Sequence, residues 1–238
     1  MLCYRRPLFA VALAAALISG RSLAQDAEEE RSIALGYVGT SGNTDTSSFN
    51  MEILYTKRVA RWTHSMKLQG LGSQENEITR AERYYFENKS DFALDDNQYL
   101  YGKGSYTDDR FSGFDFQASV SAGYGRYLVR RDNLSLEAFG GAGYRENHIT
   151  DGVTEGEVIF TLGQNLDWRI SESARLVQSL NSEIGHELTV NRFEIGLESN
   201  IIDRIATKLA FQARNTSDVP EGNKNTDTQT SVSLVYSF

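Results

Sequence analysis

Apolar and polar side chains alternate along the chain from Ser32 to Phe238, in segments of about ten residues separated by turn residues. The final segment is the clearest. Its two faces carry Val232, Leu234, Tyr236 and Phe238 on one side, and Gln229, Ser231, Ser233 and Ser237 on the other. A period of two residues is that of a β-strand whose faces meet different surroundings. The pattern therefore predicts an all-β fold.

Twelve such segments can be placed. They span 32–39, 47–57, 62–72, 82–94, 98–108, 114–127, 134–146, 157–170, 174–186, 191–201, 205–215 and 227–238. Short connections at 58–61, 95–97, 130–133, 171–173 and 202–204 alternate with longer ones at 73–81, 147–156 and 216–226. The outer connections at 109–113 and 187–190 are short exceptions. Outer-membrane barrels have an even strand number, short periplasmic turns and longer outer loops.

Aromatic residues on one face of these strands gather at the two strand ends. One band holds Tyr55, Trp62, Tyr124, Trp168, Tyr236 and Phe238, and the other holds Tyr37, Phe49, Tyr84, Phe86, Tyr106, Phe116, Tyr144 and Phe193. Two aromatic girdles with an apolar band between them are typical of a barrel that spans a membrane. We therefore predict a closed, antiparallel, up-and-down transmembrane β-barrel over 32–238. A soluble periplasmic sandwich is the less favoured alternative.

The N-terminal region predicts export. Arg5 and Arg6 precede an apolar run from Leu8 to Ile18, and small residues follow up to Ala24. The run is too short for a helix that crosses a bilayer, which needs about 20 residues, so we expect a signal peptide at 1–24. We expect residues 25–31 to form a short acidic periplasmic tail.

Composition excludes several function classes. The single cysteine, Cys3, falls in the predicted signal, so thiol catalysis and cysteine metal sites are not expected. Formal net charge is −8 and becomes −11 without Arg5, Arg6 and Arg21, which disfavours nucleic acid as a partner. Phosphate-binding loops are absent, and we predict no cofactor.

The polar face of the strands is densely charged with both signs. We expect ten residues to line the lumen: Glu52, Lys67, Lys103, Glu137, Arg145, Arg169, Glu183, Arg192, Glu194 and Lys208. A twelve-strand barrel lies between eight-strand barrels filled by side chains and sixteen-strand water-filled porins. The interior is therefore compatible either with a narrow pore or with a plugged wall. The outer connections are net negative, which favours cations at the mouth.

Catalytic and metal sites are not predicted. A barrel phospholipase needs Ser, His and a carboxamide together on the lipid-facing wall, and His186 is expected near Asn191, but Ser182 lies four residues along the strand. Among the outer acidic residues, Asp108 and Asp109, or Asp151 and Glu155, could hold Ca²⁺, although acidic loops are usually only solvated.

Four pieces of the chain carry a family resemblance. They are Gly36-Tyr37 with 40–44, the stretch 101–113, Gly123-Tyr-Gly125, and 141–145. In this combination the chain resembles the YdiY-like salt-induced outer membrane protein family, which is defined largely by a domain of unknown function. The resemblance implies an outer-membrane barrel and supplies no catalytic residues. Phe238 resembles the C-terminal aromatic residue that the barrel-assembly machinery reads.

The function that we expect is a structural or narrow-channel barrel in the outer membrane of a Gram-negative envelope, with a preference for cations and a link to salt adaptation. Its expected partners are outer-membrane lipids and lipopolysaccharide, the barrel-assembly machinery and small ions. The alternative is a lipid-binding or lipid-modifying barrel enzyme.

Overall fold

A computed structural model describes residues 27–40, 46–76, 78–109, 112–150, 152–220 and 222–238. The predicted signal peptide lies outside these residues. Twelve strands are present: β1 (Ala27–Thr40), β2 (Thr46–Val59), β3 (Trp62–Glu75), β4 (Ile78–Ala93), β5 (Gln98–Asp109), β6 (Phe114–Arg131), β7 (Leu134–Ile149), β8 (Thr154–Arg169), β9 (Ala174–Gly185), β10 (Thr189–Ile202), β11 (Ile205–Thr216) and β12 (Thr226–Ser237). Every predicted strand is confirmed. In the described residues no helix is long and apolar enough to cross a bilayer.

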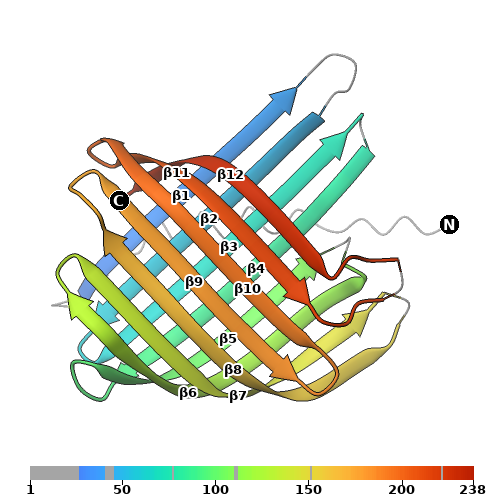
Figure 1. The fold of residues 1–238 in the computed structure, drawn as a ribbon, viewed down its shortest axis with the longest axis horizontal. Helices are drawn as coiled ribbons and strands as arrows, with labels where there is room; N and C mark the ends of the chain where they lie inside the picture. The colour runs from blue at the N-terminus through green and yellow to red at the C-terminus, as the bar shows by residue number, and fades with distance from the viewer. Residues whose placement is uncertain (1–26, 41–45, 77, 110–111, 151, 221) are drawn as a thin grey trace.

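The strands form one closed antiparallel barrel (Figure 1). Each strand pairs with its neighbours along the chain, and β1 closes the sheet by pairing with β12. Among the described residues, this closing seam has four register pairs, from Ser32 with Ser237 to Leu35 with Leu234. Side chains reinforce it, because Asn50 on β2 donates to Ser233 on β12 at 2.8 Å. The predicted fold class is therefore correct.

The outward face is apolar, as expected for strands in lipid. Its exposed large side chains include Leu35, Val120, Val158, Phe160, Leu162, Leu180, Leu197, Leu209, Val232 and Leu234. Trp62, Trp168 and Tyr236 lie exposed near the periplasmic strand ends, and Tyr37 and Tyr84 lie exposed near the outer ends. A closed barrel whose outer wall is apolar between two aromatic bands satisfies its backbone internally and can stand in a bilayer. The chain is an outer-membrane protein.

Several strand ends differ from the predicted ones. Figure 1 shows the hairpins β1–β2 and β3–β4 rising beyond the outer ends of the other strands. The predicted loop 73–81 is mostly strand, because β3 continues to Glu75 and β4 begins at Ile78. Asn76 turns the chain with a φ of 49°, and Arg80 pairs with Glu75 at 2.9 Å. The predicted loop 147–156 likewise shrinks to 150–153. The expectation of long outer loops at these two places is wrong.

The acidic segment expected as a tail is also part of the barrel. β1 begins at Ala27, so Glu28, Glu29 and Glu30 lie in the strand. The physical reason is on the neighbouring strand, where Lys57 lies 3.0 Å from Glu29 and Arg58 lies 2.7 Å from Glu30. Opposite charges across an antiparallel pair favour continued pairing.

Candidate functional site

The lumen brings together most of the charged residues that the sequence predicts there. Six of the ten predicted residues are buried inside the barrel: Glu52, Lys103, Glu137, Arg145, Glu183 and Lys208. Lys67, Arg192 and Glu194 are partly buried and line internal cavities. Arg169 is different, because it is the last residue of β8 and lies exposed at the periplasmic rim.

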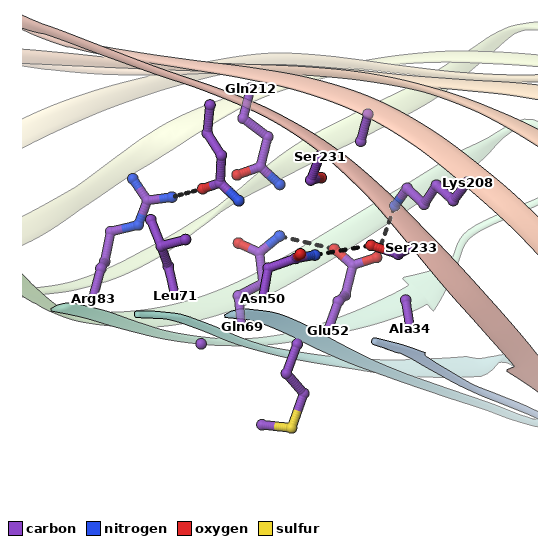
Figure 2. A pocket seen from close by; sticks show the side chains of 14 residues that line it. Ala34, Asn50, Glu52, Gln69, Leu71, Arg83, Lys208, Gln212, Ser231 and Ser233 are labelled. Carbon is purple, nitrogen blue, oxygen red and sulfur yellow. Dashed lines mark hydrogen bonds and ion pairs between the residues drawn. The ribbon is translucent and has the colours of Figure 1, made fainter. Parts of the chain in front are cut away.

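Four of these residues form an ion-pair cluster in the middle of the lumen: Glu52, Lys67, Glu194 and Lys208. Lys67 lies 2.6 Å from Glu194 and 3.5 Å from Glu52, and Lys208 lies 2.7 Å from Glu52 and 3.2 Å from Glu194. Figure 2 shows Glu52 held by Lys208 from one side and by Gln69 from the other. Two acids and two bases balance, and Lys67–Glu194 joins β3 to β10 across the lumen.

A second network lies against β7, β8 and β9. The Arg145 side chain is 1% exposed and reaches Glu157 at 2.5 Å and Glu183 at 3.6 Å. Arg192 also pairs with Glu183, at 3.2 Å. Removing one partner of a buried pair leaves an uncompensated charge, which is strongly destabilising. This network therefore acts as a structural filling of the barrel.

An aromatic cluster of Tyr99, Tyr101 and Phe139 also fills the lumen, and sequence reasoning missed it. A Cβ on Gly125 would lie 2.1 Å from the Tyr99 ring, and one on Gly163 would lie 2.1 Å from the Phe139 ring. The rings therefore lie flat on glycine backbone. The sequence signal that could have predicted this cluster is an inward-facing glycine opposite an inward-facing aromatic residue on the neighbouring strand.

The lumen holds two large chambers and a smaller cavity of about 30 Å³ beside Glu52 and Lys208. The outer chamber has a volume of about 310 Å³ and is lined mainly by β3, β4 and β10–β12. The periplasmic chamber is open, has a volume of about 1040 Å³, and is lined by residues at the periplasmic ends of the strands and by Phe238. Five side chains line both: Lys67, Glu87, Asn165, Ser179 and Glu194. The boundary between the chambers consists of side chains, two of which belong to the ion-pair cluster.

An apolar cluster narrows one side of the outer mouth. Phe114, Leu188 and Val190 are buried there, with Ile149 and Val219 packed against them. Val219 comes from the connection between β11 and β12, whereas Phe114 begins β6. In the barrel, β11 and β6 are five places apart. The β11–β12 connection therefore extends over part of the outer mouth to contact β6.

The residues considered for catalysis are arranged differently from the prediction. Asn191 is the register partner of Ser182, which donates to it at 2.7 Å. His186 lies beyond β9 in the turn, with a side chain 92% exposed, and contacts Glu187. The expected approach of His186 to Asn191 is therefore wrong, because β9 ends at Gly185 and the register puts Asn191 opposite Ser182.

Another histidine does contact a serine on the lipid-facing wall. His64 Nδ1 lies 2.8 Å from Ser90 Oγ, across the pair β3–β4 near the periplasmic end. The His64 ring stacks on Trp62 with centroids 5.7 Å apart. The two residues are register partners on β3 and β4. The sequence alone does not fix that register, so the contact was not predicted.

The acidic residues weighed as Ca²⁺ ligands are dispersed or otherwise engaged. Asp109 lies 3.3 Å from Arg214, and Glu155 is part of β8. Asp151 falls outside the described residues. Among the residues that the structure describes, no group of three or more His, Cys, Asp or Glu side chains is placed to hold a metal ion.

Comparisons with known proteins agree with this architecture. The chain is 28% identical over 210 residues to the "Uncharacterized protein YdiY" of Escherichia coli (strain K12), covering 88% of this chain and 83% of that protein. In fold it is similar to the COG4313 outer membrane channel of Pseudomonas putida F1, with a TM-score of 0.52, 10% identity, and coverage of 91% and 97% of the two chains.

A weaker likeness is to the translocator domain of the autotransporter NalP from Neisseria meningitidis. The TM-score is 0.48 at 14% identity, with 96% of this chain and 93% of that chain covered. The match by sequence identifies a family more specifically than the likeness in fold does. A family model matches residues 33–238, which is the whole barrel except the start of β1. The chain belongs to the family described as Protein of unknown function, DUF481.

Proposed function

We propose that this protein is a narrow channel for small hydrophilic solutes across the outer membrane. The observation that carries the proposal is the pair of chambers whose shared boundary consists only of side chains. Most of the residues that line the two chambers are polar or charged, and such side chains replace part of the hydration shell of a passing solute.

The ion pair at the boundary between the two chambers favours a narrow channel rather than a general diffusion pore. Lys67 and Glu194 bridge the lumen at 2.6 Å, so any solute passes beside this pair or displaces it. Both residues also contact Glu52 or Lys208, and those contacts keep the charges compensated when one pair opens. Because each charged group of the cluster has a second partner of opposite charge, separating Lys67 from Glu194 costs less free energy than separating an isolated pair.

Planar-bilayer recording tests the channel. The wild type should give single-channel currents, and the charge-neutral double variant Lys67→Ala/Glu194→Ala should give larger ones because the boundary loses two side chains. The matched control is Glu30→Ala/Arg58→Ala, which removes a 2.7 Å pair from the periplasmic chamber alone. A wild type with no current above that of a protein-free bilayer contradicts the proposal.

The expected cation preference and the link to salt belong to the same proposal. The net negative outer connections attract cations to the mouth, and this attraction weakens with ionic strength. A role in salt adaptation is supported only by the family resemblance. It predicts that a strain lacking the protein grows more slowly than its parent in high NaCl, and equal growth contradicts it.

A second candidate function, lipid modification, is favoured by the 2.8 Å contact between His64 and Ser90 on the lipid-facing wall. A serine beside a histidine is the arrangement of an activated nucleophile. Phospholipid micelles incubated with the purified protein would then release fatty acid, and Ser90→Ala would abolish the release. A wild type that releases none removes this candidate, and the stacking of His64 on Trp62 then accounts for the pair.

A further inference from the structure

Among the residues that line the outer chamber, positively charged side chains outnumber negatively charged ones. Seven of its lining residues are Lys or Arg and four are Asp or Glu. The periplasmic chamber is lined by eight of each. The sign of the excess is opposite to that of the outer connections, so it does not follow from the acidic composition of the chain.

The register of the sheet places some of these positively charged residues directly opposite one another. Arg192 on β10 stands directly opposite Arg214 on β11, and Lys89 on β4 stands directly opposite Lys103 on β5. All four side chains line the outer chamber. Like charges directly opposite each other across an antiparallel pair destabilise the sheet. Two such pairs facing one small cavity therefore need a compensating negative charge.

Carboxylates beside the chamber compensate two of these four cations, because Asp91 lies 3.0 Å from Lys89 and Glu183 lies 3.2 Å from Arg192. The other two, Lys103 and Arg214, are compensated less closely. Lys103 is 3% exposed, yet its Nζ lies 3.9 Å from Glu87 and 3.8 Å from Glu183, longer than a hydrogen bond. Arg214 lies 3.3 Å from Asp109, and its buried Nε has no hydrogen-bond partner among the described residues.

Arg83 has an uncharged partner. Its guanidinium, labelled in Figure 2, donates to the amide oxygen of Gln229 at 2.9 Å, and this contact joins β4 to β12. The lysines of the ion-pair cluster, by contrast, each have two carboxylates within 3.5 Å. The lysines on the floor of the outer chamber are therefore compensated more closely than Lys103, Arg214 and Arg83 on its wall.

We propose that the outer chamber is a binding site for a small organic anion that carries carboxylate or phosphate oxygens, with Arg83, Arg192 and Arg214 as its main ligands. The inference rests on the proposed channel and names the class of solute that it takes. Guanidinium groups suit both anions because they donate two parallel hydrogen bonds. The chamber volume of about 310 Å³ is that of a site for one small molecule. Tyr85 and Phe139 also line it and offer contact to the carbon skeleton.

Titration calorimetry on the detergent-solubilised protein tests the site independently of conduction. Citrate and inorganic phosphate at constant ionic strength are the two probes, and sucrose is the neutral control. Saturable binding of citrate is expected when the site takes carboxylates, and of phosphate alone when it takes phosphate. Arg83→Gln should weaken binding about tenfold, as the loss of a charge-assisted hydrogen bond predicts.

The matched control is Arg58→Gln, which removes the same charge from the periplasmic chamber and should change the affinity by less than about twofold. Arg83→Gln is chosen because Arg83 is partly exposed to the cavity and leaves no carboxylate unpaired. No saturable binding of either anion, or equal weakening by both variants, overturns the inference.

Conduction separates this inference from the proposed channel. In a KCl gradient Arg83→Gln should shift the reversal potential toward that of K⁺ relative to the wild type, because the outer chamber loses a positive charge. A reversal potential that Arg83→Gln leaves unchanged in a conducting channel overturns the anion site. If anion binding depends on Arg83 but no current flows, the anion site stands and the proposed channel is wrong. If current flows but no anion binds, the channel stands and the anion site is wrong.

Discussion

Strands β5–β8 and strands β3–β4 line different parts of the same lumen and fill it differently. On β5–β8, inward residues such as Tyr101, Ser119, Arg145 and Thr161 are buried. On β3 and β4 no described residue is buried, and the inward side chains face the outer chamber. We call β5–β8 the packed wall and β3–β4 the open wall.

Glycine position accounts for much of the difference between the two walls. Gly125 and Gly163 face the lumen on the packed wall, and aromatic rings lie on them. On the open wall Gly72 faces away from the lumen, and a Cβ there would meet nothing within 4 Å. Removing an inward side chain allows a large neighbour to lie flat and fill the barrel. The open space in the lumen therefore lies toward the strands that lack inward glycines.

The largest expected difference between the walls is in the loss of stability when a lumen arginine is replaced. Arg145→Met leaves Glu157 buried without its ion-pair partner and removes one of the cations beside Glu183, and it should destabilise the barrel by about 3–5 kcal/mol. Urea unfolding in lipid vesicles, followed by tryptophan fluorescence, measures the free energy of unfolding. The control Arg83→Met on the open wall loses one contact with Gln229 and should cost about 1 kcal/mol. Equal losses would show that the walls do not differ in this way.

The glycine explanation makes the second prediction. Gly125→Ala forces the Tyr99 ring off the backbone and should cost about 1–3 kcal/mol, as overpacking does. Gly72→Ala on the open wall meets open space and should stay within about 0.5 kcal/mol. The same unfolding measurement applies. A neutral Gly125→Ala would break the link between inward glycine and packing.

The smallest effect is expected from a pair of serine contacts. Ser105 and Ser119 join β5 to β6 at 2.9 Å in a buried position, and Ser48 and Ser73 join β2 to β3 at 3.0 Å in a partly buried one. Ser105→Ala should cost about 1 kcal/mol because Ser119 stays buried, and Ser48→Ala should cost less because water can replace the lost hydroxyl. The reverse order would contradict the assignment of the packed and open walls.

Sequence reasoning recovered the strands more completely than the connections or the lumen. Alternation is local, so the twelve strands and the outward direction of Val232 or Leu234 follow from short stretches of chain. Turn residues near Ser73 suggested a loop, but the pairing of β3 with β4 continued through a register shift there. Tertiary pairing overrode the local signal.

For the candidate site, the sequence determined which residues face inward and that both signs of charge are present among them. Only the closed barrel decided which of these residues meet, because Lys67 and Glu194 are 127 positions apart and depend on the register of every strand between them. The same holds for Arg192 opposite Arg214, whose excess charge is visible only once the register is set. The alternation that makes a strand acts over two residues, whereas the contacts that shape a lumen act across the whole sheet.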